Sequence, residues 1–141
     1  VVVAETGQGA YLNHVVVGDH RFLADEPRSV GGFDAGPSPY DLLAAALGAC
    51  TSMTLRMYAD RKQLPLDRVT VEVTHAKTHA TDGSEAVDGG GPLIDHFQRR
   101  VKLEGDLDDE QRQSLLKIAN RCPVHRTLEA GARIGTELSN Q

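Results

Sequence analysis

Short β-rich runs separated by turn-forming residues occupy the start of the chain. The runs are residues 1–5, 10–17 and 20–24, and the dipeptide Gly18-Asp19 between the last two is typical of a tight hairpin turn. The spacing therefore predicts an antiparallel meander of three strands.

A long helix is predicted next, from Pro39 to about residue 61. Ser38 can cap its N-terminus, Pro39 suits the first helical position, and Asp41 completes a pattern like a capping box. Residues 42–55 carry no charge and are apolar or small at nearly every position. Because a helix that is apolar on every face is buried on every face, we expect a sheet on one side and a second subunit on the other.

The second half of the chain predicts a hairpin followed by two helices. Valines at every second position from Val69 mark one strand, and residues 97–103 mark another, with a Gly-rich loop at 81–93 between them. Helices are predicted over 106–119 and from Cys122-Pro123 to about Gly131, and a last strand over 133–138. The order βββ–α–ββ–α–α–β is typical of the α+β class, with an antiparallel sheet and helices on one face.

The length, composition and charge of the chain exclude several classes of protein. The length of 141 residues suits a single domain over 1–141, and 40% hydrophobic with 25% charged residues is typical of a globular chain. The net charge is −5. A chain this acidic lacks the basic surface typical of nucleic-acid-binding proteins and the polybasic patch that attaches proteins to membranes. The uncharged run is shorter than the roughly 20 residues of a transmembrane helix.

The chain carries no recognisable secretion signal and only two cysteines, so we expect a reducing, cytoplasmic setting rather than a disulfide scaffold. It begins with Val1 rather than Met. We therefore expect either removal of the initiator or excision from a longer chain.

The two cysteines are the strongest candidates for chemistry. Cys50 lies within the apolar helix, where a lone cysteine is most often a small buried hydrophobe. Cys122 opens a helix beside Arg121, His125 and Arg126, and a helix N-terminus stabilises a thiolate. A simple cap is the alternative, although Cys caps poorly compared with Ser or Asp. Together the two thiols indicate a redox pair.

Histidines raise the alternative of a metal site. His75 and His79 share one face of a predicted strand, and His96 lies on the strand expected to pair with it. Four residues of strand separate the first two by about 13 Å, which is too far to chelate one ion directly. We therefore expect a solvated strand end and neither a metal nor another cofactor.

Two motifs resemble those of the OsmC/Ohr family. Residues 36–50, GPSPYDLLAAALGAC, resemble its turn that enters a helix with a cysteine eleven residues after the proline. Cys122-Pro123-Val124-His125 resembles its second motif, a Cys-Pro dipeptide that opens a late helix. The residues around Cys50 are closest to OsmC-type domains that occur alone or behind an α/β-hydrolase domain.

The resemblance implies an OsmC-like fold in which an antiparallel sheet wraps around a long central helix in an intertwined homodimer. It also implies a thiol peroxidase that acts on organic hydroperoxides in oxidative stress defence. Cys50 would attack the peroxide and become a sulfenic acid, Cys122 would form a disulfide with it, and an external dithiol would reduce the pair.

This sequence departs from the peroxidase branch of the family at two places. That branch carries a Glu where this chain has Tyr40 and an Arg where it has Gln8. The candidate substitutes are Asp41 for the acid and Arg21 or Arg28 for the cation. Alternative functions are a non-catalytic dimeric module that binds a small apolar or thiol ligand, and an accessory domain of a hydrolase.

Overall fold

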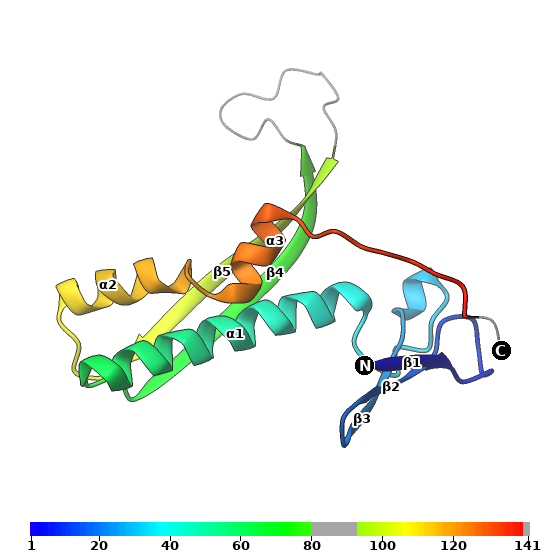
Figure 1. Cartoon of the computed structure of the whole chain (residues 1–141), viewed down its shortest axis with the longest axis horizontal. Helices are drawn as coiled ribbons and strands as arrows, with labels where there is room; N and C mark the ends of the chain where they lie inside the picture. Colours follow the sequence, from blue (N-terminus) through cyan, green and yellow to red (C-terminus); the bar gives the residue numbers. More distant parts are fainter. Residues whose placement is uncertain (80–92, 140–141) are drawn as a thin grey trace. The chain divides into compact units, whose positions relative to one another are not determined.

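A computed structural model describes residues 1–79 and 93–139, apart from the side chain of His79. Nearly all of the loop predicted at 81–93 lies outside these residues. The chain forms two compact units, one of residues 1–45 and 74–98 and the other of residues 46–73 and 99 onward. Figure 1 traces the elements of both.

The first unit contains the predicted meander. Strands β1 (Val2–Glu5), β2 (Asn13–Val17) and β3 (His20–Ala24) pair antiparallel in the order β1-β2-β3. Val15 on the central strand is the partner of both Val3 and Phe22. The prediction is confirmed, except that β2 begins three residues late because residues 10–12 belong to the preceding turn.

A connector after β3 is held by one buried carboxylate. Asp25 accepts hydrogen bonds from the backbone N–H groups of Glu26 (2.8 Å), Phe33 (2.9 Å) and Ala35 (3.2 Å), which closes the chain around the short helix η1 (Arg28–Val30). Burial acts to raise the pKa of Asp25, but these backbone donors outweigh it and lower the pKa below its usual value. The carboxylate therefore stays ionised and fixes the connector.

The long helix α1 (Pro39–Lys62) begins with the predicted cap. The backbone N–H of Asp41 donates to Ser38 Oγ (3.2 Å), and the Asp41 carboxylate accepts from the Ser38 N–H (3.0 Å) and hydroxyl (2.7 Å). Such reciprocal bonds satisfy backbone donors that have no partner within the helix.

Within this chain α1 is covered on one face rather than on every face. Its buried residues are Leu47, Gly48, Thr51, Leu55 and Ala59. Met53 and Met57 are 65% and 73% exposed on the opposite side. By length and composition alone this helix could also cross a membrane, but core helices meet the same criterion.

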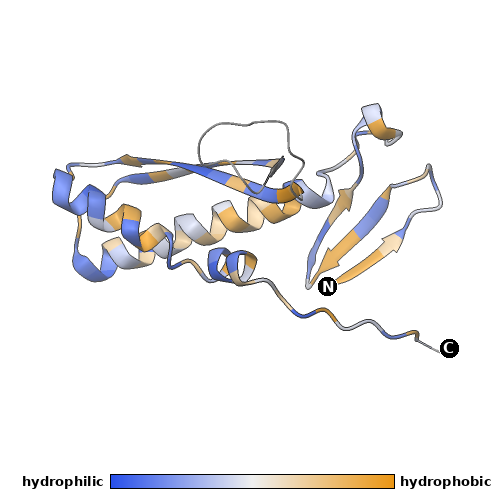
Figure 2. Cartoon of the chain, turned by 90° about the horizontal axis from the view of Figure 1, so that it is seen from above, coloured by the Kyte–Doolittle hydropathy of each residue, from blue (hydrophilic) through white to orange (hydrophobic). Residues whose placement is uncertain are grey.

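Strands β4 (Arg68–His79) and β5 (Leu93–Glu104) pair with each other, and α2 (Asp109–Ala119) and α3 (Pro123–Ala130) follow. Residues 68–73 of β4 and 99–104 of β5 belong to the second unit, together with both of these helices. The core of this unit joins α1, α2 and the adjoining turns through six buried residues, namely Leu55, Ala59, Leu66, Leu107, Leu115 and Ala119. In Figure 2 much of the α2 ribbon is coloured hydrophilic, and the middle of α1 is coloured toward hydrophobic.

Two details of the predicted architecture are wrong. Among the residues that the structure describes, the strands form two sheets, one of three and one of two strands, instead of a single sheet. Residues 133–138 form no strand, because within the described chain they have no hydrogen-bonded neighbour, and Ile134 and Leu138 are 89% and 88% exposed. Alternating apolar residues become a strand only where another strand edge is available.

Candidate functional site: a pair of thiols

Cys50 and Cys122 lie together in the second unit. Both are free cysteines, and although they are far apart in sequence their thiols lie close enough to shift each other's pKa. Cys122 is fully buried, whereas Cys50 is half-buried. The more accessible sulfur is therefore the one on α1.

The chain around Cys122 shows why its sulfur lies at a helix start. After α2 the backbone makes a tight turn, in which Arg121 N–H donates to the carbonyl of Ile118 (2.8 Å), and Pro123 then begins α3. Cys122 is the N-cap as predicted, and its sulfur accepts a hydrogen bond from the His125 N–H (3.5 Å). The unpaired N–H groups of a helix start thus point at a thiol.

These donors stabilise a negative charge on Cys122. Burial acts to raise its pKa, but hydrogen bonds from Cys50, the His125 N–H, the Thr51 hydroxyl and the Val124 N–H outweigh it and lower the pKa below that of an ordinary thiol. The sequence had pointed to this property of the helix start.

The opposite holds for Cys50. Burial raises the pKa of its thiol, and the hydrogen bond with Cys122 raises it further, while the Val124 N–H and the Thr54 hydroxyl act in the other direction. Because the two thiols interact, a single negative charge belongs to the pair, and the donors at the start of α3 favour its Cys122 end.

Arg99 on β5 is a residue that the sequence reasoning missed. Its guanidinium donates to Thr51 Oγ1 (2.9 Å), the Ala119 carbonyl (2.9 Å) and Asn120 Oδ1 (2.8 Å), and approaches His125 Nδ1 (3.1 Å). It thereby joins α1, the end of α2 and the start of α3. The sequence signal that could have found Arg99 is its place two residues before Val101 on a predicted strand, because such residues point to the same face of the sheet.

The contact with Arg99 also fixes the tautomer of His125. Because a guanidinium only donates, His125 Nδ1 must accept, and the ring proton belongs on Nε2. That nitrogen lies 3.3 Å from Glu129 Oε2, which can accept it. The ring is thus held between a cation and a carboxylate.

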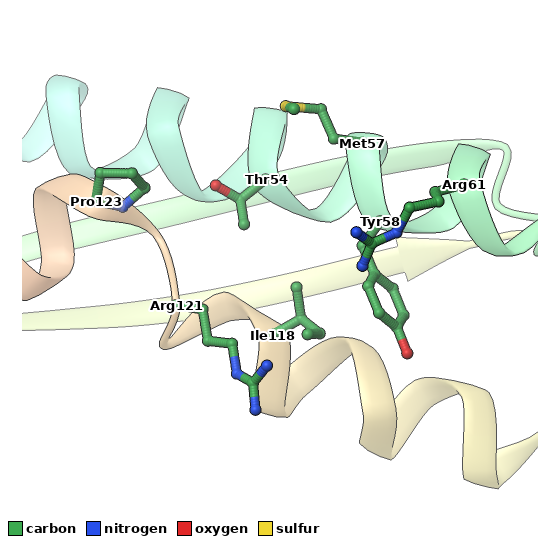
Figure 3. Close-up of a pocket in the computed structure, with 7 residues that line it drawn as sticks. All are labelled: Thr54, Met57, Tyr58, Arg61, Ile118, Arg121 and Pro123. Carbon is green, nitrogen blue, oxygen red and sulfur yellow. The ribbon is translucent and has the colours of Figure 1, made fainter.

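The second unit has an open pocket of about 380 Å³ (Figure 3), and neither cysteine is among its lining residues. It is lined by Thr54, Met57, Tyr58, Arg61, Ile118, Arg121 and Pro123. Pro123 follows Cys122 in the chain, and the Thr54 hydroxyl donates to the carbonyl of Cys50 (2.7 Å). The pocket therefore has a largely apolar wall near the thiols and two arginines on its lining.

The family model described as OsmC-like protein matches residues 32–137, a region that includes both cysteines. The chain belongs to this OsmC-like family. The resemblance of the two cysteine motifs is thereby confirmed. No curated protein matches the chain.

Solved structures share the fold of this OsmC-like protein. One from Psychrobacter arcticus, described as an osmotic stress induced and detoxification response protein, is 22% identical with a TM-score of 0.69, covering 90% of this chain and 87% of that one. An organic hydroperoxide resistance protein OsmC from Legionella pneumophila is 19% identical with a TM-score of 0.63, covering 90% and 88%.

A third similar structure is the organic hydroperoxide resistance protein OhrB of Bacillus subtilis, with 21% identity, a TM-score of 0.59 and coverage of 90% of both chains. These likenesses confirm the α+β fold with antiparallel sheets and a long helix.

The remaining predicted site residues of the OsmC-like protein belong to the first unit. Asp41 is engaged with Ser38 in the helix cap, and the hydrogen bonds from Ser38 lower the pKa of its carboxyl. Arg21 lies on β3 and Arg28 opens η1, and both are exposed. Their assignment as substitutes for the family's acid and cation stays a prediction.

The prediction of a solvated strand end is wrong for His75. Its ring stacks on Tyr40 at 4.2 Å between centroids and packs against Phe97 at 4.7 Å, and its Nε2 lies 2.8 Å from Asp95 Oδ1. Only 18% of its side chain is exposed, because the two aromatic rings cover it. Within residues 1–79 and 93–139, no cluster of three side chains suited to a metal ion occurs.

Proposed function

We propose that this OsmC-like protein is a thiol-dependent peroxidase that reduces organic hydroperoxides through Cys50 and Cys122. The observation that carries the proposal is the pair of free thiols that lie near each other, one half-buried and one fully buried. The pocket of the second unit, with Met57, Ile118 and Pro123 in its lining, suits an organic substrate better than hydrogen peroxide. Two similar structures are named organic hydroperoxide resistance proteins.

In the first step Cys50 attacks the terminal oxygen of the hydroperoxide. The S–O bond forms as the O–O bond breaks, the sulfur is oxidised to a sulfenic acid, and the alkoxide leaves as the alcohol after taking a proton from solvent water. Cys122, which carries the charge of the pair, accepts the proton from the Cys50 thiol as the attack proceeds. Cys50 is the attacking sulfur because Cys122 is fully buried.

In the second step the Cys122 sulfur attacks the sulfenic acid of Cys50. The S–S bond forms, the S–O bond breaks, and the hydroxyl leaves as water with the proton from Cys122. Two thiols have then been oxidised and one hydroperoxide reduced to an alcohol. An external dithiol restores both thiols by exchange.

The protein acts as a cytoplasmic, single-domain homodimer in this proposal, without a metal or other cofactor. The uncovered side of α1, which carries Met53 and Met57, supports the dimer because exposed apolar residues of this size favour a partner surface. Asp41, Arg21 and Arg28 are proposed to assist the thiols from their own or the partner chain.

A binding module is the second candidate, favoured by the raised pKa of Cys50. In that case the fold holds a small apolar or thiol ligand with little turnover.

The test measures consumption of an alkyl hydroperoxide in the presence of a dithiol, by the wild type, Cys50→Ser and Cys122→Ser. We expect turnover by the wild type, none by Cys50→Ser, and a trappable sulfenic acid in Cys122→Ser. Inert thiols in the folded wild type would contradict the peroxidase and favour the binding module.

A further inference from the structure

Arg99 is a half-buried cation whose hydrogen bonds all go to uncharged groups. Its four partners are Thr51 Oγ1, the Ala119 carbonyl, Asn120 Oδ1 and His125 Nδ1. Among the described residues, no carboxylate forms an ion pair with it. A cation in a partly desolvated site without a counter-charge favours a negative charge nearby.

Two of these four partners are also partners of Cys122. The backbone N–H of His125 donates to its sulfur (3.5 Å), and the Thr51 hydroxyl acts to lower the pKa of the same thiol. Arg99 therefore reaches Cys122 through one residue on α1 and another on α3.

The bond from Arg99 to Thr51 constrains where the single proton of the hydroxyl can go. Thr51 Oγ1 already accepts from the guanidinium, and it lies 2.7 Å from the Leu47 carbonyl, to which it can donate. When Cys122 is ionised, the proton can turn toward the sulfur while the bond from Arg99 stays in place. The hydroxyl is thus a donor held ready for a thiolate.

We propose that Arg99 is a positioning residue for the thiolate of Cys122. By holding Thr51 and His125 it keeps their donors directed at the sulfur. This inference rests on the proposed peroxidase, in which that thiolate accepts the proton of Cys50 and the same sulfur later forms the disulfide. Arg99 itself touches neither sulfur in this role.

The groups that face Cys122 come from three elements. Cys50 approaches from α1, Arg99 acts from β5, and His125 with its partner Glu129 lies on α3. Loss of Arg99 leaves the Cys50 and backbone donors but removes the bond that holds the Thr51 hydroxyl in place. Cys122 then holds its proton more tightly.

The experiment compares Arg99→Met and Arg99→Lys with Arg100→Met in the full chain. Arg100 is the neighbouring arginine of β5, with a side chain 83% exposed, so its removal controls for loss of one charge. The first readout is the ultraviolet absorbance of thiolate against pH, with Cys122→Ser as the baseline. It requires no peroxide and so remains informative even where the protein fails to reduce one.

We expect the thiolate absorbance of Arg99→Met to rise at higher pH than that of the wild type, with Arg99→Lys between them and Arg100→Met unchanged. The second readout is the rate of disulfide formation after a stoichiometric pulse of alkyl hydroperoxide. We expect a loss of about tenfold in Arg99→Met, which corresponds to one hydrogen bond to a charged group.

A folded Arg99→Met with the titration and the disulfide rate of the wild type would overturn the inference. If Arg99→Met fails to fold, Arg99→Lys decides, because it keeps the charge but loses the fork that joins Thr51 and His125. A wild type that titrates as expected but ignores peroxide would contradict the proposed function and leave the role of Arg99 in thiol ionisation standing.

Discussion

Replacing Thr51 by valine tests the link between Arg99 and the thiol pair. Thr51 is fully buried, and valine keeps nearly the same shape while removing the hydroxyl. The change deletes the acceptor of one guanidinium hydrogen bond (2.9 Å) and the donor to the Leu47 carbonyl (2.7 Å). It leaves Arg99 Nη1 its second bond, to the Ala119 carbonyl.

The size of the effect follows from these bonds. A hydrogen bond to a charged group contributes about 1.5–3 kcal/mol, and the retained bond to Ala119 limits the loss, so we expect the free energy of unfolding to fall by about 2 kcal/mol. For a chain of this size, that corresponds to a drop of about 8 °C in Tm. Because the hydroxyl also acts to lower the pKa of Cys122, that pKa should rise in the variant.

The assays are denaturant unfolding and the thiolate titration, with Thr70→Val as the matched control. Thr70 is exposed on β4, so the same chemical change there should alter neither quantity appreciably. A Thr51→Val protein as stable as the wild type, with the same titration curve, would refute the reasoning about this network.

Two further predictions concern the fold. Leu115 is fully buried, whereas Leu116 is 53% exposed on the same helix. Leu115→Ala should therefore lower the free energy of unfolding by about 2–5 kcal/mol, and Leu116→Ala by less than about 1 kcal/mol. Equal losses of stability in urea unfolding would contradict the assignment of Leu115 to the core. Since backbone hydrogen bonds lower the pKa of folded Asp25 below that of an ordinary aspartate, the stability it contributes is present above the pKa of the unfolded chain and is lost as the pH falls through the folded pKa. The free energy of unfolding of Asp25→Asn, measured against pH, should therefore lack this loss of stability in acid. A loss in acid identical to that of the wild type would disprove the stabilising role of the Asp25 carboxylate.

Most elements could be predicted from local signals. The turn at Gly18, the cap formed by Ser38 and Asp41, and the Cys122-Pro123 helix start all depend on neighbours in sequence, and the structure contains each of them. The failed strand at 133–138 depends on a distant pairing edge instead, and periodicity alone carries no information about that edge.

Of the residues in the candidate site, only the two cysteines could be predicted from the sequence. The motifs identified Cys50 and Cys122, but Arg99 lies on a strand far from both in sequence and meets Thr51 and His125 only after folding. The packing of His75 between Tyr40 and Phe97 was missed for the same reason, since it joins three separate elements. Polar contacts between residues far apart in sequence cannot be predicted from the periodicity of apolar residues.

Intact-mass spectrometry of the reduced protein, after a brief exposure to one equivalent of an alkyl hydroperoxide, tests the proposed thiol chemistry most directly. We predict a loss of two hydrogens from the wild type, with Cys50 and Cys122 joined in one disulfide-linked peptide, and no such loss in Cys50→Ser. The reaction with hydrogen peroxide should be slower. An unchanged mass after prolonged exposure of folded, reduced protein would contradict the peroxidase.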